Sequence, residues 1–187
     1  MLNENFTIKL LITGCGKNDR TSQKGLYNLL SEFALKIAYR YTSIDEDPMD
    51  YVYKGFLELL TNLPSFNKSS NSELLCALKN LFKNILLDTC IEFAKPENYN
   101  QKEFTDYLSN GHQQSIQSLS SEEIIERVRA LPFPDRIIFN LAVIDNFDLF
   151  EISAKLQIPL HEVASRLRQS RERLQMDISL NVIYEHL

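Results

Sequence analysis

The sequence has few cysteines, no long apolar run and no basic N-terminal cluster, and each absence excludes a class of protein. Its three cysteines, Cys15, Cys76 and Cys90, lack the C-x-x-C spacing of a zinc or redox pair, which favours reduced thiols. No apolar run approaches the roughly 20 residues that span a bilayer, so we expect no membrane insertion. The opening stretch MLNENFTIKLLITGC has acidic and amide residues where a secretory signal is basic, so we expect a cytoplasmic protein.

The sequence also lacks a phosphate-binding glycine loop, although Gly16 and Lys17 form a Gly-Lys pair. A nucleotide-binding loop needs a glycine five residues before this pair and a hydroxyl directly after the lysine. Those positions hold Leu11 and Asn18. We therefore expect a turn that precedes a helix, and no nucleotide.

Candidate catalytic and metal-binding groups are sparse. The three histidines lie far apart and have no H-E-x-x-H or comparable ligand spacing. A group of acidic residues lacks the turn glycine and the distal glutamate of a calcium loop, and the start of a helix explains it better. Its members are Asp45, Glu46, Asp47 and Asp50. We expect no enzyme activity, no metal and no cofactor.

Apolar residues recur at helical spacing along most of the chain, and no strand pattern persists. The expected helices cover about 23–41, 48–63, 73–93, 122–131, 135–145, 149–156 and 160–184. Between Ala94 and Ser121 the sequence is polar and amide-rich, which is typical of a linker. The sequence therefore predicts an all-α fold with an N-terminal helical bundle (1–93), a linker (94–121) and a second helical domain (122–187).

The second domain contains a helix-turn-helix pattern, in which Ile152 and Leu156 face inward before a turn at Gln157. On the following helix the expected buried positions are Val163, Leu167, Leu174 and Ile178. The exposed candidates for DNA contact are Ser165, Arg166, Arg168, Gln169, Arg171 and Arg173. Arginine pairs with phosphate or guanine and glutamine pairs with adenine, so these types suit groove reading. A solvated basic face, or one that docks on an acidic partner, is the alternative.

Four stretches resemble bacterial RNA polymerase sigma factors of the extracytoplasmic-function (ECF) type. They are GCGKNDRTSQKGLYNLLSEFALKIAYRY, DPMDYVYKGFLELLTNLPSF, LFKNILLD and, with the best match, EIIERVRALPFPDRIIFNLAVIDNFDLFEISAKLQIPLHEVASRLRQSRERLQ. The resemblance implies a transcription initiation factor, monomeric when free, that binds core RNA polymerase and promoter DNA, and it leaves an anti-sigma partner open. The implied polymerase contacts are Asp47, Asp50, Tyr53, Lys54 and Phe56. The implied contacts to the proximal promoter element are Lys79, Lys83 and Asn84.

The chain departs from the family pattern at a few positions. Tyr53 and Lys54 replace a glutamine and a glutamate, and Ala77 replaces a common tryptophan. Two alternatives therefore remain: a sigma-like protein that binds a partner without opening DNA, and a helix-turn-helix repressor with a helical sensor domain. A repressor of this kind would be expected to dimerise.

Overall fold

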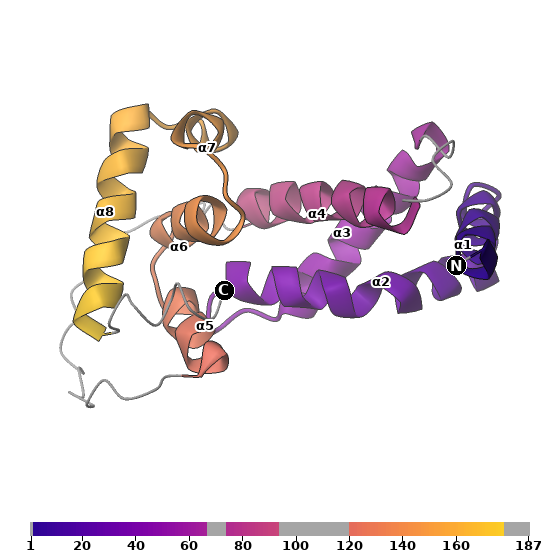
Figure 1. Cartoon of the computed structure of the whole chain (residues 1–187), viewed down its shortest axis with the longest axis horizontal. Helices are drawn as coiled ribbons and strands as arrows, with labels where there is room; N and C mark the ends of the chain where they lie inside the picture. Colours follow the sequence, from indigo (N-terminus) through magenta and orange to yellow (C-terminus); the bar gives the residue numbers. More distant parts are fainter. Residues whose placement is uncertain (1, 67–73, 94–119, 178–187) are drawn as a thin grey trace. The chain divides into compact units, whose positions relative to one another are not determined.

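The structure is a computed structural model, and it describes residues 2–66, 74–93 and 120–177 (Figure 1). These residues form helices joined by turns and contain no β-strand, so the all-α prediction is confirmed. The chain divides into two compact units. The first holds Met1–Tyr39 and Asp47–Glu92, and the second holds Arg40–Glu46 and the described part of Phe93–Leu187. This division departs from the expected 1–93 and 122–187 at Arg40–Glu46, and nearly all of the expected linker lies outside the described residues.

The first unit begins with a helix that sequence reasoning missed, α1 (Leu2–Cys15). Its sequence, LNENFTIKLLITGC, is rich in asparagine, threonine and isoleucine, which have modest helix propensity. Ile8 and Ile12 are each 1% exposed, so burial of one helix face stabilises α1 where propensity does not. The other elements of this unit are α2 (Arg20–Tyr41, of which Arg40 and Tyr41 belong to the second unit), α3 (Pro48–Asn62), the 3-10 turn η1 (Leu63–Ser65) and α4 (Leu74–Phe93).

The Gly-Lys pair lies in the tight turn between α1 and α2. The backbone N–H groups of Lys17 and Asp19 both donate to the carbonyl of Gly14, at 2.9 and 3.0 Å, so they are not directed at a phosphate. The Asp19 carboxylate then caps α2 by accepting from Ser22, both from its hydroxyl at 2.6 Å and from its N–H at 2.8 Å. These two hydrogen bonds, the first being the stronger cause, lower the pKa of Asp19. The turn is thus a helix connection, as expected.

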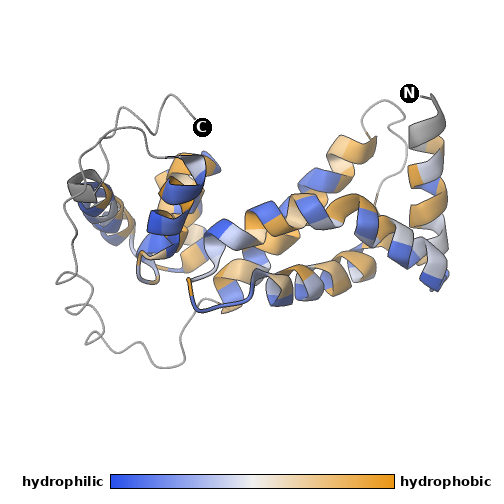
Figure 2. Cartoon of the chain, turned by 90° about the horizontal axis from the view of Figure 1, so that it is seen from below, coloured by the Kyte–Doolittle hydropathy of each residue, from blue (hydrophilic) through white to orange (hydrophobic). Residues whose placement is uncertain are grey.

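Helices α2, α3 and α4 pack around an aromatic core. The Phe56 ring on α3 meets Tyr27 on α2 edge to face at 5.2 Å between centroids, and meets Phe82 on α4 at 6.3 Å. Gly55 allows this close approach, because a methyl group there would collide with Leu86 on α4. Each helix carries both apolar and polar residues around its circumference, as Figure 2 shows. The three-helix packing predicted for this part of the chain is therefore present.

The second unit contains α5 (Ser121–Arg129), α6 (Asp135–Phe139), the π-helix η4 (Asn140–Ile144), α7 (Leu149–Leu156) and α8 (Leu160–Asp177). A capping box starts α5: the Ser120 hydroxyl accepts from the N–H of Glu123, whose carboxylate accepts from the N–H of Ser120. The side chains of Ile137, Ile152 and Val163 are completely buried and join α6, α7 and α8 in one core. No helix in the described ranges is long and apolar enough to cross a membrane.

Candidate DNA-binding site

Helices α7 and α8 form the predicted helix-turn-helix (Figure 1). α7 begins with a capping box between Asp148 and Glu151, which fixes its first residue at the predicted position. It ends at Leu156, and the next residue, the C-cap Gln157, has a φ of 58°, in the left-handed region. This backbone conformation costs a residue with a Cβ roughly 1 kcal/mol of stability. The Ser153 hydroxyl helps to hold the turn by donating to the carbonyl of Ile158 at 2.6 Å.

The buried stripe of α8 is the one that the spacing predicts. Val163, Leu167 and Leu174 are 0%, 7% and 2% exposed, while Ile178 lies outside the described residues. On the opposite side, Arg168, Gln169 and Arg171 are exposed, and the side chain of Arg168 is 73% exposed. These three residues therefore remain candidates for DNA contact. Ser165 is half-buried.

Arg166 and Arg173 differ from the expectation of exposed DNA contacts. Both side chains are only about one quarter exposed and bind the same buried carboxylate, that of Asp135 on α6. The Nη1–oxygen distances are 3.1 Å for Arg166 and 2.6 Å for Arg173. Asp135 lies 31 residues before Arg166, so no local pattern reveals the contact. The two arginines fix α8 to α6 instead of pointing wholly to solvent.

The surroundings of Arg166 keep it charged. Burial alone would lower the pKa of Arg166, but hydrogen bonds to Glu162 and Asp135, together with the charges of these two residues, raise it above its ordinary value. Its Nε donates to Glu162 at 2.8 Å. The four charges of Arg166, Arg173, Asp135 and Glu162 sum to zero. The exposed positive charge of α8 in this region comes instead from Arg168 and Arg171. Glu172 lies 3.9 Å from Arg168 in an exposed, weak pair.

The outer face of α3 holds most of the residues implied for polymerase contact. Asp47 caps the helix by accepting from the N–H of Met49 at 2.9 Å, and Asp50 and Lys54 are exposed. Tyr53 is 53% exposed, and its ring stacks on Tyr27, 6.0 Å between centroids. Phe56, by contrast, is 8% exposed and belongs to the core. Its ring faces α2 and α4, so it supports the outer face from within the core.

Sequence reasoning missed an exposed apolar residue on this face, Leu57. It is 65% exposed and follows Tyr53 by one helical turn, so the two side chains lie on the same face of α3. The signal that would have revealed it is the i, i+4 spacing of two large side chains outside the buried stripe. Together Tyr53 and Leu57 make this face partly apolar.

The residues implied for the proximal promoter element lie on α4. Lys79 and Lys83 are half-buried and one turn apart, and Asn84 is exposed. The ammonium of Lys79 lies 5.4 Å from the centre of the Phe33 ring, a cation–π contact that holds its side chain against α2. Lys79 and Lys83 therefore lie along one edge of α4.

Two of the acidic residues considered as a cation site, Glu46 and Asp47, have structural roles. Glu46 accepts from the N–H of Ser43 at 2.6 Å, and Asp47 is the cap of α3. The described residues contain no cluster of three or more histidine, cysteine, aspartate or glutamate side chains that could hold a metal ion. His161 is exposed at the start of α8, and the other two histidines lie outside the described ranges.

Comparisons with known proteins agree with this geometry. The family model described as sigma-70, region 4, matches residues 121–174, which is the span of α5 to α8 up to Leu174. The fold and this match define a helix-turn-helix unit of the sigma-70 type. The chain is also 24% identical over 183 residues to the ECF RNA polymerase sigma factor SigW of Bacillus subtilis (strain 168), covering 91% of this chain and 96% of that protein. The predicted resemblance to ECF sigma factors is thereby confirmed.

Proposed function

We propose that the chain is an ECF-type sigma factor that directs core RNA polymerase to promoters. The observation that carries this proposal is the exposed set Arg168, Gln169 and Arg171 on α8, within the part matched by sigma-70 region 4. α8 enters the major groove of the distal promoter element, where arginine binds phosphate or guanine and glutamine binds adenine. Such a protein makes and breaks no covalent bond, so its activity requires neither a catalytic group nor a cofactor.

The first unit supplies the other two contacts of this proposal. Core polymerase binds the outer face of α3 through Asp50, Tyr53 and Lys54, with Leu57 adding apolar area. The proximal promoter element lies along the α4 edge that carries Lys79, Lys83 and Asn84. Within the second unit, Arg166 and Arg173 position α8, and Ser165 lies at the margin of the DNA-facing surface. The free chain is a monomer, and an anti-sigma partner would cover the same surfaces.

In vitro transcription tests the proposal directly. Core RNA polymerase from the organism that encodes the chain is supplied with fragments of its genomic DNA and with either the natural chain or Arg168→Ala/Arg171→Ala. We expect specific transcripts with the natural chain and their loss with the double variant. Lys36→Ala is the matched control, because Lys36 is 74% exposed on α2 and pairs only across one helical turn with Glu32. Transcripts that survive in the double variant would refute the role of α8.

A second candidate is a sigma-like protein that binds polymerase without opening promoters. The observation that favours it is the Asp135 contact, which occupies two of the four arginines of α8. Co-elution with core polymerase in the absence of transcripts would support this candidate. Absence of both co-elution and transcripts would refute the two proposals together. If Tyr53→Ser/Leu57→Ser abolishes co-elution, the polymerase contact lies on α3.

A further inference from the structure

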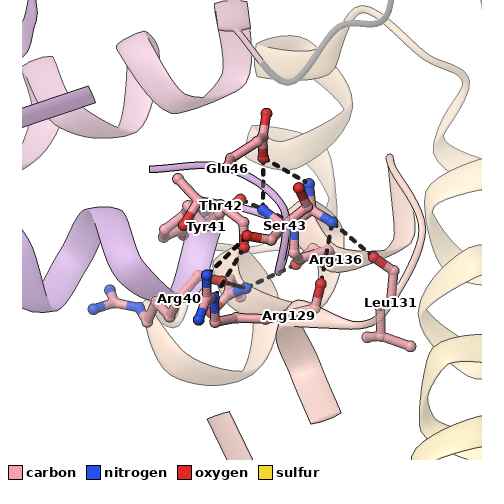
Figure 3. Close-up of polar contacts among 9 residues, drawn as sticks. Arg40, Tyr41, Thr42, Ser43, Glu46, Arg129, Leu131 and Arg136 are labelled. Carbon is pink, nitrogen blue, oxygen red and sulfur yellow. Dashed lines mark hydrogen bonds and ion pairs between the residues drawn. The ribbon is translucent and has the colours of Figure 1, made fainter. Parts of the chain in front are cut away.

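The segment Arg40–Glu46 belongs to the second unit and is held there by side chains of α5, α6 and η4 (Figure 3). Arg129 donates to the carbonyls of Thr42 and Ser43, at 3.4 and 2.8 Å. Arg136 donates to the carbonyl of Tyr41 at 2.9 Å, and Asn140 donates to that of Arg40 at 2.9 Å. Three side chains therefore bind four successive carbonyls. We call Arg129, Arg136 and Asn140 the carbonyl clamp.

The chemistry of the clamp matches the group that it binds. The last carbonyls of a helix have no partner within the helix and carry partial negative charge, and α2 ends at Tyr41. Guanidinium and amide N–H groups supply the missing donors. Arg129, Arg136 and Asn140 are 6%, 5% and 0% exposed, so the clamp is a built, buried site and not a set of surface contacts.

A second anchor lies beside the clamp, at Asp145. Its carboxylate accepts from the Nη2 of Arg40 at 2.7 and 2.6 Å and from the hydroxyl of Tyr41 at 2.6 Å. Glu46 lies 3.8 Å from Arg136, which adds a weaker attraction at the far end of the segment. The segment is thus attached at both ends and in the middle by polar contacts, and burial of the Tyr41 side chain adds to them.

Two polar atoms of the attachment lack hydrogen-bond partners among the described residues. Within the described parts of the chain, the Nε of Arg40 and the Oδ1 of Asn140 are buried without a hydrogen-bond partner. A buried polar atom without a partner lowers stability, and a buried charge gains little net stability from its pairing. Water would satisfy both atoms if the segment separated from the clamp. Ile44 is 44% exposed and adds little apolar burial, so the apolar burial that opposes this separation is chiefly that of Tyr41, which is fully buried.

We propose that the carbonyl clamp is a docking site for the segment Arg40–Glu46, and that the segment detaches from it without unfolding of α5 to α8. The site takes main-chain carbonyls at the end of a helix, here those of this chain. While docked, the segment moves with α6 and therefore with α8, to which α6 is bound through Asp135. Detachment makes the DNA-facing helix independent of the segment.

Hydrogen exchange followed by mass spectrometry on the full chain tests the proposal. We expect the amides of Thr42–Glu46 to exchange at least about tenfold faster than those of α6, because local opening requires less free energy than unfolding of the unit. Arg129→Met should raise exchange of these amides about a further tenfold, the effect of losing a charge-assisted hydrogen bond. Exchange in α6 and α8 should stay unchanged, since the Arg129 guanidinium donates to the segment and to Glu126.

Two further variants make the outcome decisive. Tyr41→Phe removes only the hydroxyl that binds Asp145 and should raise exchange in the same amides. Lys36→Met, one helical turn before Arg40, removes an exposed charge and should change nothing. If the Thr42–Glu46 amides exchange at the rate of α6, and Arg129→Met accelerates both equally, the segment is a permanent part of the core and the proposal is refuted. If Arg129→Met leaves exchange of the segment unchanged, the clamp does not hold it.

Discussion

Replacing Asp135 by asparagine tests whether the shared carboxylate holds α8 in place. The carboxylate is 3% exposed and accepts from Arg166 at 3.1 Å and from Arg173 at 2.6 Å. Asparagine keeps the shape and removes the charge. Its single carbonyl oxygen can accept from one arginine, while its amide nitrogen turns a donor toward the N–H of the other. At least one charge-assisted hydrogen bond is therefore lost.

The magnitude follows from these contacts. A hydrogen bond to a charged group contributes about 1.5–3 kcal/mol. The arginines are 27% and 26% exposed, so water replaces part of the lost interaction and the upper end of the range does not apply. We expect Asp135→Asn to lower the free energy of unfolding of the second unit by about 2 kcal/mol. The loss should appear equally in α6 and α8.

Native-state hydrogen exchange is the suitable assay, because two units need not unfold in one transition and the chain has no tryptophan as a fluorescent probe. The control is Glu172→Gln, which breaks the exposed pair with Arg168 at 3.9 Å. Its expected effect is below about 0.5 kcal/mol. If Asp135→Asn and Glu172→Gln have equally small effects, the two arginines are effectively solvated and the proposed positioning of α8 is wrong.

Three further predictions concern other parts of the chain. Cys76 should react with a thiol reagent before the two buried cysteines, Cys15 and Cys90. Burial, with a smaller effect of the nearby Asp19 charge, raises the pKa of the Cys15 thiol and slows its reaction further. Mass spectrometry of partly alkylated protein would show this order, and equal rates would contradict the burial of Cys15 and Cys90. Gly14→Ala should lower the free energy of unfolding by about 1 kcal/mol, since its methyl group collides with the Ser22 side chain. Gly16→Ala has space for the methyl group and should leave stability unchanged. A thermal denaturation in which the two variants behave alike would argue against the α1–α2 turn. Loss of both exposed arginines of α8 should reduce the slope of log affinity for DNA against log salt by about 2. A larger reduction of the slope would mean that other cations contact DNA only when these two arginines are present. No reduction would place α8 away from the phosphates.

The fold was predictable where local signals mark the ends of helices. The start of α7 follows from Asp148 and Glu151, whose spacing is that of a capping box, and its end follows from the apolar pattern that stops at Leu156. The start of α3 follows in the same way from Asp47 and Pro48. Each of these signals acts within four residues, so one sequence contains all the information needed.

The contacts that were missed connect residues far apart in the chain. Arg129 binds carbonyls 86 and 87 residues earlier, and no pattern in either stretch indicates the other. α1 was missed for a related reason, because its stability comes from the burial of Ile8 and Ile12 and not from the propensity of its residues. Tertiary contacts of this kind are fixed only when the whole unit has folded.

The arginines of the second unit show why a count of basic residues overstates a DNA-binding surface. Arg129 and Arg136 bind backbone carbonyls, and Arg166 and Arg173 bind the carboxylate of Asp135, so all four act within the protein. Two arginines of α8 remain exposed for phosphate or base contact. With only two cations on α8, we expect the electrostatic part of the DNA affinity of this helix to be small, and we expect binding to draw on base contacts and on polymerase. A sigma factor built in this way would bind promoter DNA weakly alone and depend on polymerase for occupancy, and the salt dependence of its DNA affinity tests this expectation.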